Sequence, residues 1–296
     1  MSEISSSRRP QAEQHVDGER AQKLIRAQFA PLPERSIVAL SEGWDYTVYL
    51  VDDAWTFRFP RREVVVPGTE REVAVLAQLE LPLPVPRPEY VGAPAEAFPW
   101  PFYGARYIPG EEAVGLDVDA RMRLARPLGR FLRSLHAYDL DLPVDLLRRS
   151  DMTFRVSRAR EALADLADLW EPPAQIEDVL REAEALPPAE PTAVVHGDLH
   201  FRQLLVHGGE LSGVIDWVDV CRADPGQDFV PFWTLLPPAG RAELLAEYGP
   251  ISEESLLRGR VLALGLNAVL ARYGLDEGLP SVEAEAIAGL ERAALT

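Results

Sequence analysis

Residues 1–20 are polar with no sustained period, and several short strand-like segments follow them within the first 108 positions. A short amphipathic helix is predicted before them, over Gln22–Phe29, because Leu24, Ile25 and Phe29 share one side at helical spacing. Strands are predicted over five segments: Ser36–Leu40, Thr47–Val51, Trp55–Phe59, Glu89–Val91 and Phe102–Ile108. Short acidic residues tolerate tight-turn geometry, so Asp52-Asp53 predicts a hairpin between the second and third strands.

One longer helix interrupts these strands, and we expect it over Thr69–Glu80. Thr69 followed three residues later by Glu72 has the spacing of a capping box, which predicts the start of the helix. The segment Leu81–Pro88 holds four prolines in eight residues, so it cannot be regular and must end the helix.

The rest of the chain is dominated by hydrophobic residues at helical spacing. Helices are predicted over Val118–Ala137, Phe154–Trp170, Gln175–Leu186, Gly240–Tyr248, Glu254–Tyr273 and Val282–Ala294. Short apolar strands interrupt them at Ala193–Val195, Leu204–Val206 and Leu211–Ile215. We therefore expect an α+β chain with a loose arm over 1–20, a small strand-rich lobe over 21–108 and a mainly helical lobe over 109–296. The hinge is expected at Pro109-Gly110.

Charge and composition narrow the possible partners. The 296 residues carry 47 acidic and 30 basic side chains, a formal net charge of −17. Such a field repels phosphate backbones and anionic lipids, so neither nucleic acid nor a membrane surface is an expected partner. A single cysteine, Cys221, excludes an internal disulfide framework. Without a run of 18 apolar residues or a signal-like N-terminus, the chain is expected to be cytoplasmic.

The most informative chemistry lies in the segment 194–217. His196-Gly197-Asp198 follows one predicted strand, and Asp216 follows the last of the three short strands. Two carboxylates at strand ends suit a divalent cation together with a base that takes a proton from a hydroxyl. Each residue taken alone is also common in tight turns, where it satisfies backbone groups, so the spacing of the whole segment carries the prediction.

This segment resembles the catalytic loop of the aminoglycoside phosphotransferase family. Its members are small-molecule kinases with the bilobal protein-kinase fold, and macrolide and choline kinases are among their relatives. The resemblance covers roughly residues 21–290 and is strongest over 194–229. It implies a small antiparallel-sheet lobe and a mainly helical lobe, with ATP or GTP as co-substrate, Mg²⁺ as cofactor and a small-molecule hydroxyl as acceptor.

The resemblance also implies roles for residues of the helical lobe. Asp198 matches the aspartate that accepts the proton of the acceptor hydroxyl, and His196 is the loop histidine that braces it. Asp216 matches the aspartate that holds Mg²⁺ against the phosphates, with Gln203 at the second metal position. Asp224 and Asp228, in Asp-Pro-Gly-Gln-Asp, resemble the segment that supports this loop.

Residues of the small lobe are implied to bind the nucleotide. Arg58 on the third strand matches the cation that contacts the phosphates, and Glu72 matches the helix glutamate that orients this cation. Gly43 lies in the loop that would cover the nucleotide. Tyr107 and Ile108 lie in the expected hinge, where backbone groups would bind the base.

Two residues depart from the family pattern. Gln203 stands where asparagine is usual, which places the same amide oxygen on a stem one methylene longer. Arg58 stands where lysine is usual, and its planar fork grips phosphate in a different geometry. These departures keep a second hypothesis open, a degenerate kinase-fold protein that binds nucleotide or small molecule without catalysis. The identity of the acceptor, and the choice between ATP and GTP, are not readable from the sequence.

Other histidines and motifs add little. His200, two residues past Asp198, is interpreted as a surface loop residue, with contact to substrate or phosphate as the alternative, and His136 shows no partner at a characteristic spacing. The sequence contains neither a P-loop nor a dinucleotide fingerprint, which argues against the commonest alternative nucleotide-binding folds.

Overall fold

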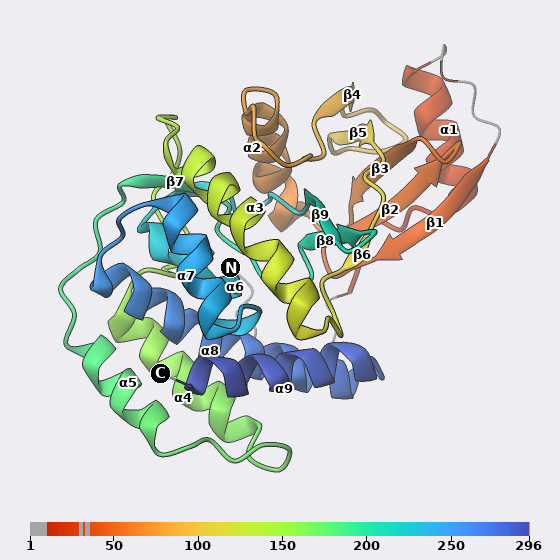
Figure 1. Ribbon diagram of the computed structural model, residues 1–296. Helices are drawn as coiled ribbons and strands as arrows, with labels where there is room; N and C mark the ends of the chain where they lie inside the picture. The colour runs from red at the N-terminus through yellow and green to blue at the C-terminus, as the bar shows by residue number, and fades with distance from the viewer. Residues whose placement is uncertain (1–10, 30–31, 33–35, 296) are drawn as a thin grey trace. The chain divides into compact units, whose positions relative to one another are not determined.

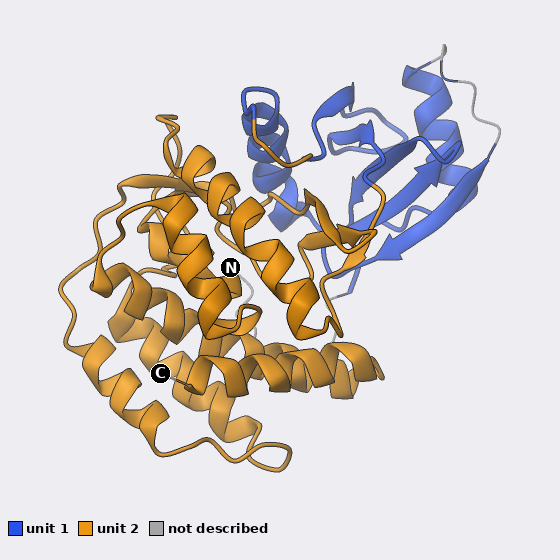
Figure 2. Ribbon diagram, in the orientation of Figure 1, with its two compact units in different colours: residues 1–80, 85–108 blue, residues 81–84, 109–296 orange. Residues whose placement is uncertain are grey.

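The computed structural model describes residues 11–29, 32 and 36–295, and the chain divides into two compact units (Figures 1 and 2). Unit 1 contains residues 1–80 and 85–108, and unit 2 contains residues 81–84 and 109–296. Unit 1 is built on one sheet with two α-helices. Unit 2 combines two small sheets with a set of packed helices.

Unit 1 contains a five-stranded antiparallel sheet in the order β1-β2-β3-β5-β4. Its strands are β1 (Ile37–Glu42), β2 (Tyr46–Val51), β3 (Trp55–Pro60), β4 (Pro88–Gly92) and β5 (Phe102–Arg106). Val51 pairs with Trp55 across the turn between β2 and β3, and Asp52 and Asp53 both have positive φ angles. The predicted hairpin is therefore confirmed: the N–H of Ala54 donates to the Val51 carbonyl at 3.1 Å, and Asp52 and Asp53 are the two left-handed residues at the centre of this turn.

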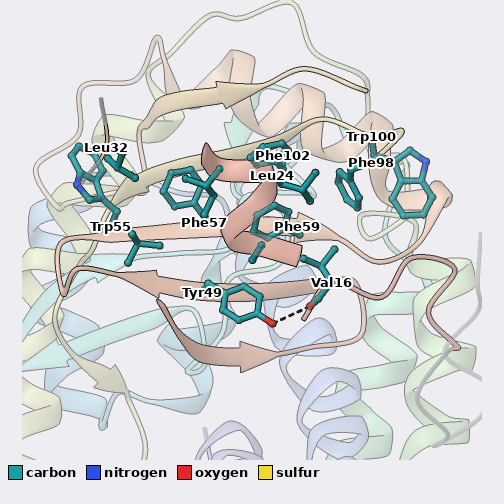
Figure 3. Close-up of a cluster of buried hydrophobic side chains, with 13 residues drawn as sticks. Val16, Leu24, Leu32, Tyr49, Trp55, Phe57, Phe59, Phe98, Trp100 and Phe102 are labelled. Atoms are coloured by element: carbon teal, nitrogen blue, oxygen red, sulfur yellow. Dashed lines mark hydrogen bonds between the residues drawn. The ribbon is translucent and has the colours of Figure 1, made fainter. Parts of the chain in front are cut away.

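The core of unit 1 lies between this sheet and helix α1 (Gly18–Gln28). Trp55, Phe57 and Phe59 alternate along β3, so their rings share one face and meet the apolar side of α1 (Figure 3). The rings of Phe59 and Phe102 stack with centroids 4.8 Å apart. Burying each such ring contributes about 2–3 kcal/mol, so this cluster stabilises the unit strongly.

The predicted loose arm is wrong where the structure describes it. Helix α1 begins at Gly18, four residues before the expected start, and Asp17 caps it by accepting the N–H of Arg20 at 2.8 Å. Val16 is buried, and its carbonyl accepts the Tyr49 hydroxyl at 2.9 Å. Residues 1–10 of the arm lie outside the described residues.

The helix predicted over Thr69–Glu80 is displaced towards the N-terminus. A 3-10 turn, η1 (Glu63–Val65), leads directly into α2 (Val66–Leu76). Pro67 lies in the first turn of α2, where backbone N–H groups have no acceptor within the helix, so the lack of an N–H in proline costs no hydrogen bond. Thr69 is consequently inside the helix, and its hydroxyl donates to the Val65 carbonyl at 3.0 Å instead of capping the helix.

Two small antiparallel sheets form the strand part of unit 2. One pairs β7 (Ala193–Val195) with β10 (Cys221–Ala223), and the other has the order β6-β8-β9. Its strands are β6 (Glu111–Glu112), β8 (Leu204–His207) and β9 (Glu210–Val214). The sequence predicted β7, β8 and β9, which are short apolar runs, but not β6 or β10, because Glu111–Glu112 is wholly charged and Cys221–Ala223 has an arginine at its centre.

Helices make up most of unit 2 (Figure 1). They are α3 (Val118–His136), α4 (Met152–Asp165), α5 (Gln175–Glu184), η2 (Pro225–Phe229), α6 (Val230–Thr234), α7 (Pro238–Tyr248), α8 (Glu253–Asp276) and α9 (Pro280–Ala294). Helix α8 packs against both α4 and α9, and α3 packs against α7. Among the described residues, no helix combines the length and apolar character needed to cross a membrane.

Candidate functional site

The loop His196-Gly197-Asp198 leaves strand β7 and is held by a buried carboxylate. Asp228, in η2, accepts the N–H of His196 at 2.7 Å and that of Gly197 at 3.0 Å. Gly197 has a φ of +87°, and a Cβ there would lie 2.4 Å from the Asp219 carbonyl oxygen. Only glycine fits both the backbone conformation and this close approach.

Asp228 is itself part of a buried network. The Nε2 atom of His136 lies 3.1 Å from its carboxylate, and His136 Nδ1 lies 2.9 Å from the Tyr248 hydroxyl. Burial alone would raise the pKa of Asp228, but the hydrogen bond and charge of His136, together with the loop N–H groups, bring it below its ordinary value. The predicted support from the Asp-Pro-Gly-Gln-Asp segment is confirmed, and the partner of His136 emerges only in the fold.

The other acidic residue of that segment, Asp224, fastens η2 to the helices. Its Oδ1 accepts the N–H of Gly226 at 2.8 Å. Its Oδ2 contacts the Ser255 hydroxyl at 3.1 Å and Arg258 at 3.3 Å, both on α8. The segment that supports the loop is therefore anchored to the longest helix of unit 2.

His196 uses both ring nitrogens on backbone groups. Its Nε2 lies 3.0 Å from the Ile215 carbonyl, and its Nδ1 accepts the N–H of Asp198 at 3.3 Å. Burial lowers the pKa of His196 below its ordinary value, which favours the neutral tautomer that this pattern requires. The side chain therefore links the Asp198 loop to the end of β9, and this bracing leaves no ring nitrogen for proton transfer.

The Asp198 carboxylate is 27% exposed and lies in a strongly charged environment. Arg149 contacts its Oδ1 at 2.8 Å, and His200 Nε2 lies 3.9 Å from its Oδ2. Burial, opposed by the charge of Arg149 and assisted by the charges of Asp219 and Asp216, raises the pKa of Asp198 to about 7. His200 is buried rather than on the surface, and burial lowers its pKa to about 3, so the ring is neutral.

Asp216 and Gln203 lie on adjoining backbone segments. Asp216 follows β9 with a φ of +68°, and the N–H of its neighbour Ile215 donates to the Gln203 carbonyl at 3.0 Å. The side-chain Oε1 of Gln203 is buried and accepts no hydrogen bond from the described residues. The Asp216 carboxylate and the Gln203 amide oxygen are ligand types that suit Mg²⁺, which takes few protein ligands and completes its shell with phosphate and water.

No group of three or more histidine, cysteine, aspartate or glutamate side chains that could hold a metal occurs among the described residues. A dedicated all-protein cage, as for structural zinc, is therefore not formed by that part of the chain. The donor set at Asp216 and Gln203 instead fits a cation that arrives with its phosphate ligands.

In unit 1, Arg58 and Glu72 form a buried ion pair. Alternation along β3 places Arg58 on the face opposite the aromatic core, where its Nη1 lies 2.8 Å from Glu72 Oε1. The guanidinium carbon lies 4.2 Å from the centre of the Tyr46 ring. The hydroxyl of Tyr46 in turn contacts the Thr69 hydroxyl at 2.8 Å, which fixes the ring against α2.

The remaining predicted nucleotide-binding residues are placed in loops of unit 1. The Gly43 N–H donates to the Tyr46 carbonyl at 2.9 Å, and a Cβ at Gly43 would meet only that oxygen at 3.8 Å, so glycine is not required there. Tyr107 follows β5, and its N–H donates to the Ala54 carbonyl at 2.9 Å. This amide is used inside unit 1 and is not available to a base, while Ile108 is the last residue of the unit.

Arg149 is the principal residue that the sequence did not reveal. It precedes α4 and contacts both Asp198 and Asp219, each at 2.8 Å. No motif marks it, because the contacts span 49 and 70 positions of the chain. The only sequence signal is Asp145, whose carboxylate accepts backbone N–H groups of the same loop.

Known proteins resemble this chain in sequence and in fold. The profile of the group described as the phosphotransferase enzyme family matches residues 36–260. The uncharacterized protein YcbJ of Bacillus subtilis (strain 168) is 26% identical, over 76% of this chain and 78% of that protein. Aminoglycoside 3'-phosphotransferase of Escherichia coli is 32% identical, over 48% of this chain and 56% of that protein.

Solved structures show the same fold at low sequence identity. The GDP complex of wild-type aminoglycoside 2'-phosphotransferase-IIIa is 21% identical and superposes with a TM-score of 0.68, covering 94% of this chain and 98% of that one. The apoenzyme of macrolide 2'-phosphotransferase MphH from Brachybacterium faecium, also 21% identical, gives 0.59 over 91% and 97%. The predicted α+β kinase-like fold is confirmed. Because the family profile matches most of its length, this chain belongs to the phosphotransferase enzyme family and is a small-molecule kinase.

Proposed function

We propose that the chain transfers the γ-phosphoryl group of ATP or GTP to a hydroxyl of a small molecule of the aminoglycoside or macrolide type. The observation that carries this proposal is the link between Asp198 and Asp216: the His196 ring contacts the N–H of Asp198 at 3.3 Å and the carbonyl of Ile215, the residue before Asp216, at 3.0 Å. Asp198 is partly exposed, as a base that meets an acceptor must be. Relatives that act on aminoglycosides and macrolides support the acceptor class.

In this reaction Asp198 accepts the proton of the acceptor hydroxyl. The acceptor oxygen forms a bond to the γ-phosphorus, the bond from that phosphorus to the bridging oxygen breaks, and a nucleoside diphosphate leaves. Asp216 and the Gln203 amide oxygen are the residues that would hold Mg²⁺, which neutralises phosphate charge when it is bound. Most of the catalysis then comes from positioning and electrostatics.

Arg58 supplies the positive charge that a phosphate-binding strand requires. Its ion pair with Glu72 and its stacking on Tyr46 hold the guanidinium in one orientation. An arginine held in this way can contact two phosphate oxygens at once, where a lysine would contact them as a point charge. The departure from lysine is therefore compatible with nucleotide binding.

Incubation of the purified chain with Mg²⁺, ATP or GTP, and kanamycin, gentamicin, streptomycin or a macrolide tests the proposal. Mass spectrometry should detect a phosphorylated acceptor, and the better nucleotide should be identified by the rate. Nucleotide that binds without transfer to any acceptor, and without hydrolysis by water, would favour the binding-protein alternative that Gln203 and Arg58 motivate.

A further inference from the structure

Arg149 contacts the catalytic loop at three points within unit 2. Its Nη2 lies 2.8 Å from Asp198 Oδ1, and its Nη1 lies 2.8 Å from Asp219 Oδ2. The same Nη1 also donates to the carbonyl oxygen of Gly197, the residue between His196 and Asp198. One guanidinium thus binds the Asp198 carboxylate, the Gly197 carbonyl just before it in the chain, and the Asp219 carboxylate.

The chain holds Arg149 in place through its own loop. Asp145 accepts the backbone N–H of Arg149 at 2.7 Å and that of Ser150 at 2.8 Å. The side-chain amide of Gln227 donates to Asp145 at 2.9 Å and to the Ser150 hydroxyl at 2.7 Å. Gln227 lies next to Asp228, so the element that supports the catalytic loop also supports the loop that carries Arg149.

A second attachment joins the loop that carries Arg149 to the sheet of β7 and β10. The N–H of Asp145 donates to the Arg222 carbonyl at 3.0 Å, and the N–H of Arg222 donates to the Pro143 carbonyl at 2.9 Å. Arg222 is part of β10, which pairs with β7, the strand that leads into His196. Arg149 and Asp198 are therefore positioned by the same two-stranded sheet.

The charges explain why an arginine is needed at this point. The negative charges of Asp219 and Asp216 both act on Asp198, and Arg149 contacts the carboxylates of Asp198 and Asp219. Burial would lower the pKa of Arg149, but the two carboxylates raise it above its ordinary value, so the guanidinium stays charged. Arg149 binds Oδ1 of Asp198, so Oδ2 is the oxygen that can meet the hydroxyl of the small molecule. The neutral His200 ring lies 3.9 Å from this Oδ2 atom.

We propose that Arg149 is a positioning residue of phosphoryl transfer, which binds Oδ1 of Asp198 and thereby directs Oδ2 towards the acceptor hydroxyl. This inference rests on the proposed function. Arg149 fixes one rotamer of the base and balances the charge of Asp219 beside it. Small displacements of a reacting group have large costs in rate, so loss of Arg149 acts on turnover more than on nucleotide binding.

Replacement of Arg149 by methionine, lysine and alanine tests this role, with Arg160→Met as the matched control. Arg160, on α4, also joins two carboxylates, Glu177 and Glu184, and neither belongs to the Asp198 loop. The measurements are kcat, KM for nucleotide, KM for the acceptor found to be phosphorylated, and the midpoint of thermal unfolding. Hydrolysis of ATP and GTP by water is measured in parallel, because it needs no acceptor.

Arg149→Met should lower kcat about 10- to 100-fold with KM for nucleotide changed less than about threefold. Arg149→Lys should keep more activity than Arg149→Met, and millimolar guanidinium chloride should raise kcat of Arg149→Ala but not of Arg149→Met, whose side chain fills the space. Arg160→Met should match the wild type. Recovery with guanidinium distinguishes positioning from a general loss of folding.

A kcat for Arg149→Met within twofold of the wild type would overturn this inference alone. So would a loss of activity that follows the fall in unfolding midpoint, with no recovery in guanidinium. Absence of any transfer or hydrolysis by the wild type would instead overturn the proposed function, and the role of Arg149 with it.

Discussion

Arg58 on β3 pairs with Glu72 on α2 at 2.8 Å, and both side chains are buried. From the sequence, an arginine in place of lysine at position 58 leaves the hypothesis of a degenerate kinase-fold protein open. The structure keeps the ion pair, and the flat guanidinium gains a stacking partner in Tyr46 that a lysine would not use in the same way. The substitution therefore alters the geometry of the cation without removing the charge.

Replacement of Arg58 alone should lower the free energy of unfolding, and replacement of Glu72 as well should restore most of it. Arg58→Met leaves a buried carboxylate without its arginine, which should lower the free energy of unfolding by about 3 kcal/mol. The double variant Arg58→Met, Glu72→Met should recover much of that loss, because both charges are gone. Chemical denaturation of the two single variants and the double variant measures the coupling.

Nucleotide affinity separates the two roles of this pair. The double variant should be stable and yet bind nucleotide at least about tenfold more weakly, because the phosphate-binding cation is absent. Additive losses of stability, or undiminished nucleotide affinity in the stable double variant, would contradict this reading of Arg58.

Asp228 should contribute to both the free energy of unfolding and the rate of phosphoryl transfer. The Asp228 carboxylate accepts two loop N–H groups and contacts His136. In Asp228→Asn, one of its oxygens becomes an NH₂ group, which cannot accept these hydrogen bonds. We expect the free energy of unfolding to fall by about 2–4 kcal/mol and kcat to fall about tenfold or more. Asp178→Asn, an exposed site on α5, is the control and should change neither quantity.

The same carboxylate predicts a specific dependence of stability on pH. The pKa of Asp228 is lowered in the fold, so its contribution is fully present above the ordinary aspartate range and is lost as pH falls through the lower folded value. The stability difference between the wild type and Asp228→Asn should be constant above about pH 5 and should narrow below about pH 4. Denaturation series at stepped pH measure it, and a difference that widens on acidification would refute the assignment.

Gln203 should affect the metal requirement more than the fold. Its Oε1 is buried and accepts no hydrogen bond from the described residues, so Gln203→Met should change the unfolding midpoint without nucleotide by only about one degree or two. The Mg²⁺ concentration that supports half-maximal nucleotide binding should rise about tenfold. Titration of nucleotide binding with Mg²⁺ tests this, and an unchanged titration would exclude Gln203 as a ligand.

The sequence predicts best the features whose causes are local. The Asp52-Asp53 hairpin follows from two residues that tolerate left-handed geometry, and the loop around Asp198 follows from spacing within about twenty positions. The predicted start of α2 is wrong because the capping-box spacing of Thr69 and Glu72 lies inside the helix, whereas Pro67 in the first turn marks where the helix begins. Local patterns thus located the elements and misjudged a boundary.

The contacts that complete the site are not local. His136 reaches Asp228 across 92 positions, and Arg149 reaches Asp219 across 70. Neither residue has a distinctive neighbour in the sequence, because its role depends on the packing of α3 and of the loop before α4 against the sheet of β7 and β10. Such partners become visible only when the fold brings separate segments together.

The transfer rate of Asp198→Asn tests the central claim most directly. The substitution keeps size and an Oδ1 acceptor for Arg149 but removes the base, with Asp141→Asn at an exposed position as the control. We predict a fall in kcat of about 10²- to 10⁴-fold, with nucleotide affinity within about threefold of the wild type. Turnover by Asp198→Asn at a rate close to that of the wild type would contradict the assignment of Asp198 as the base.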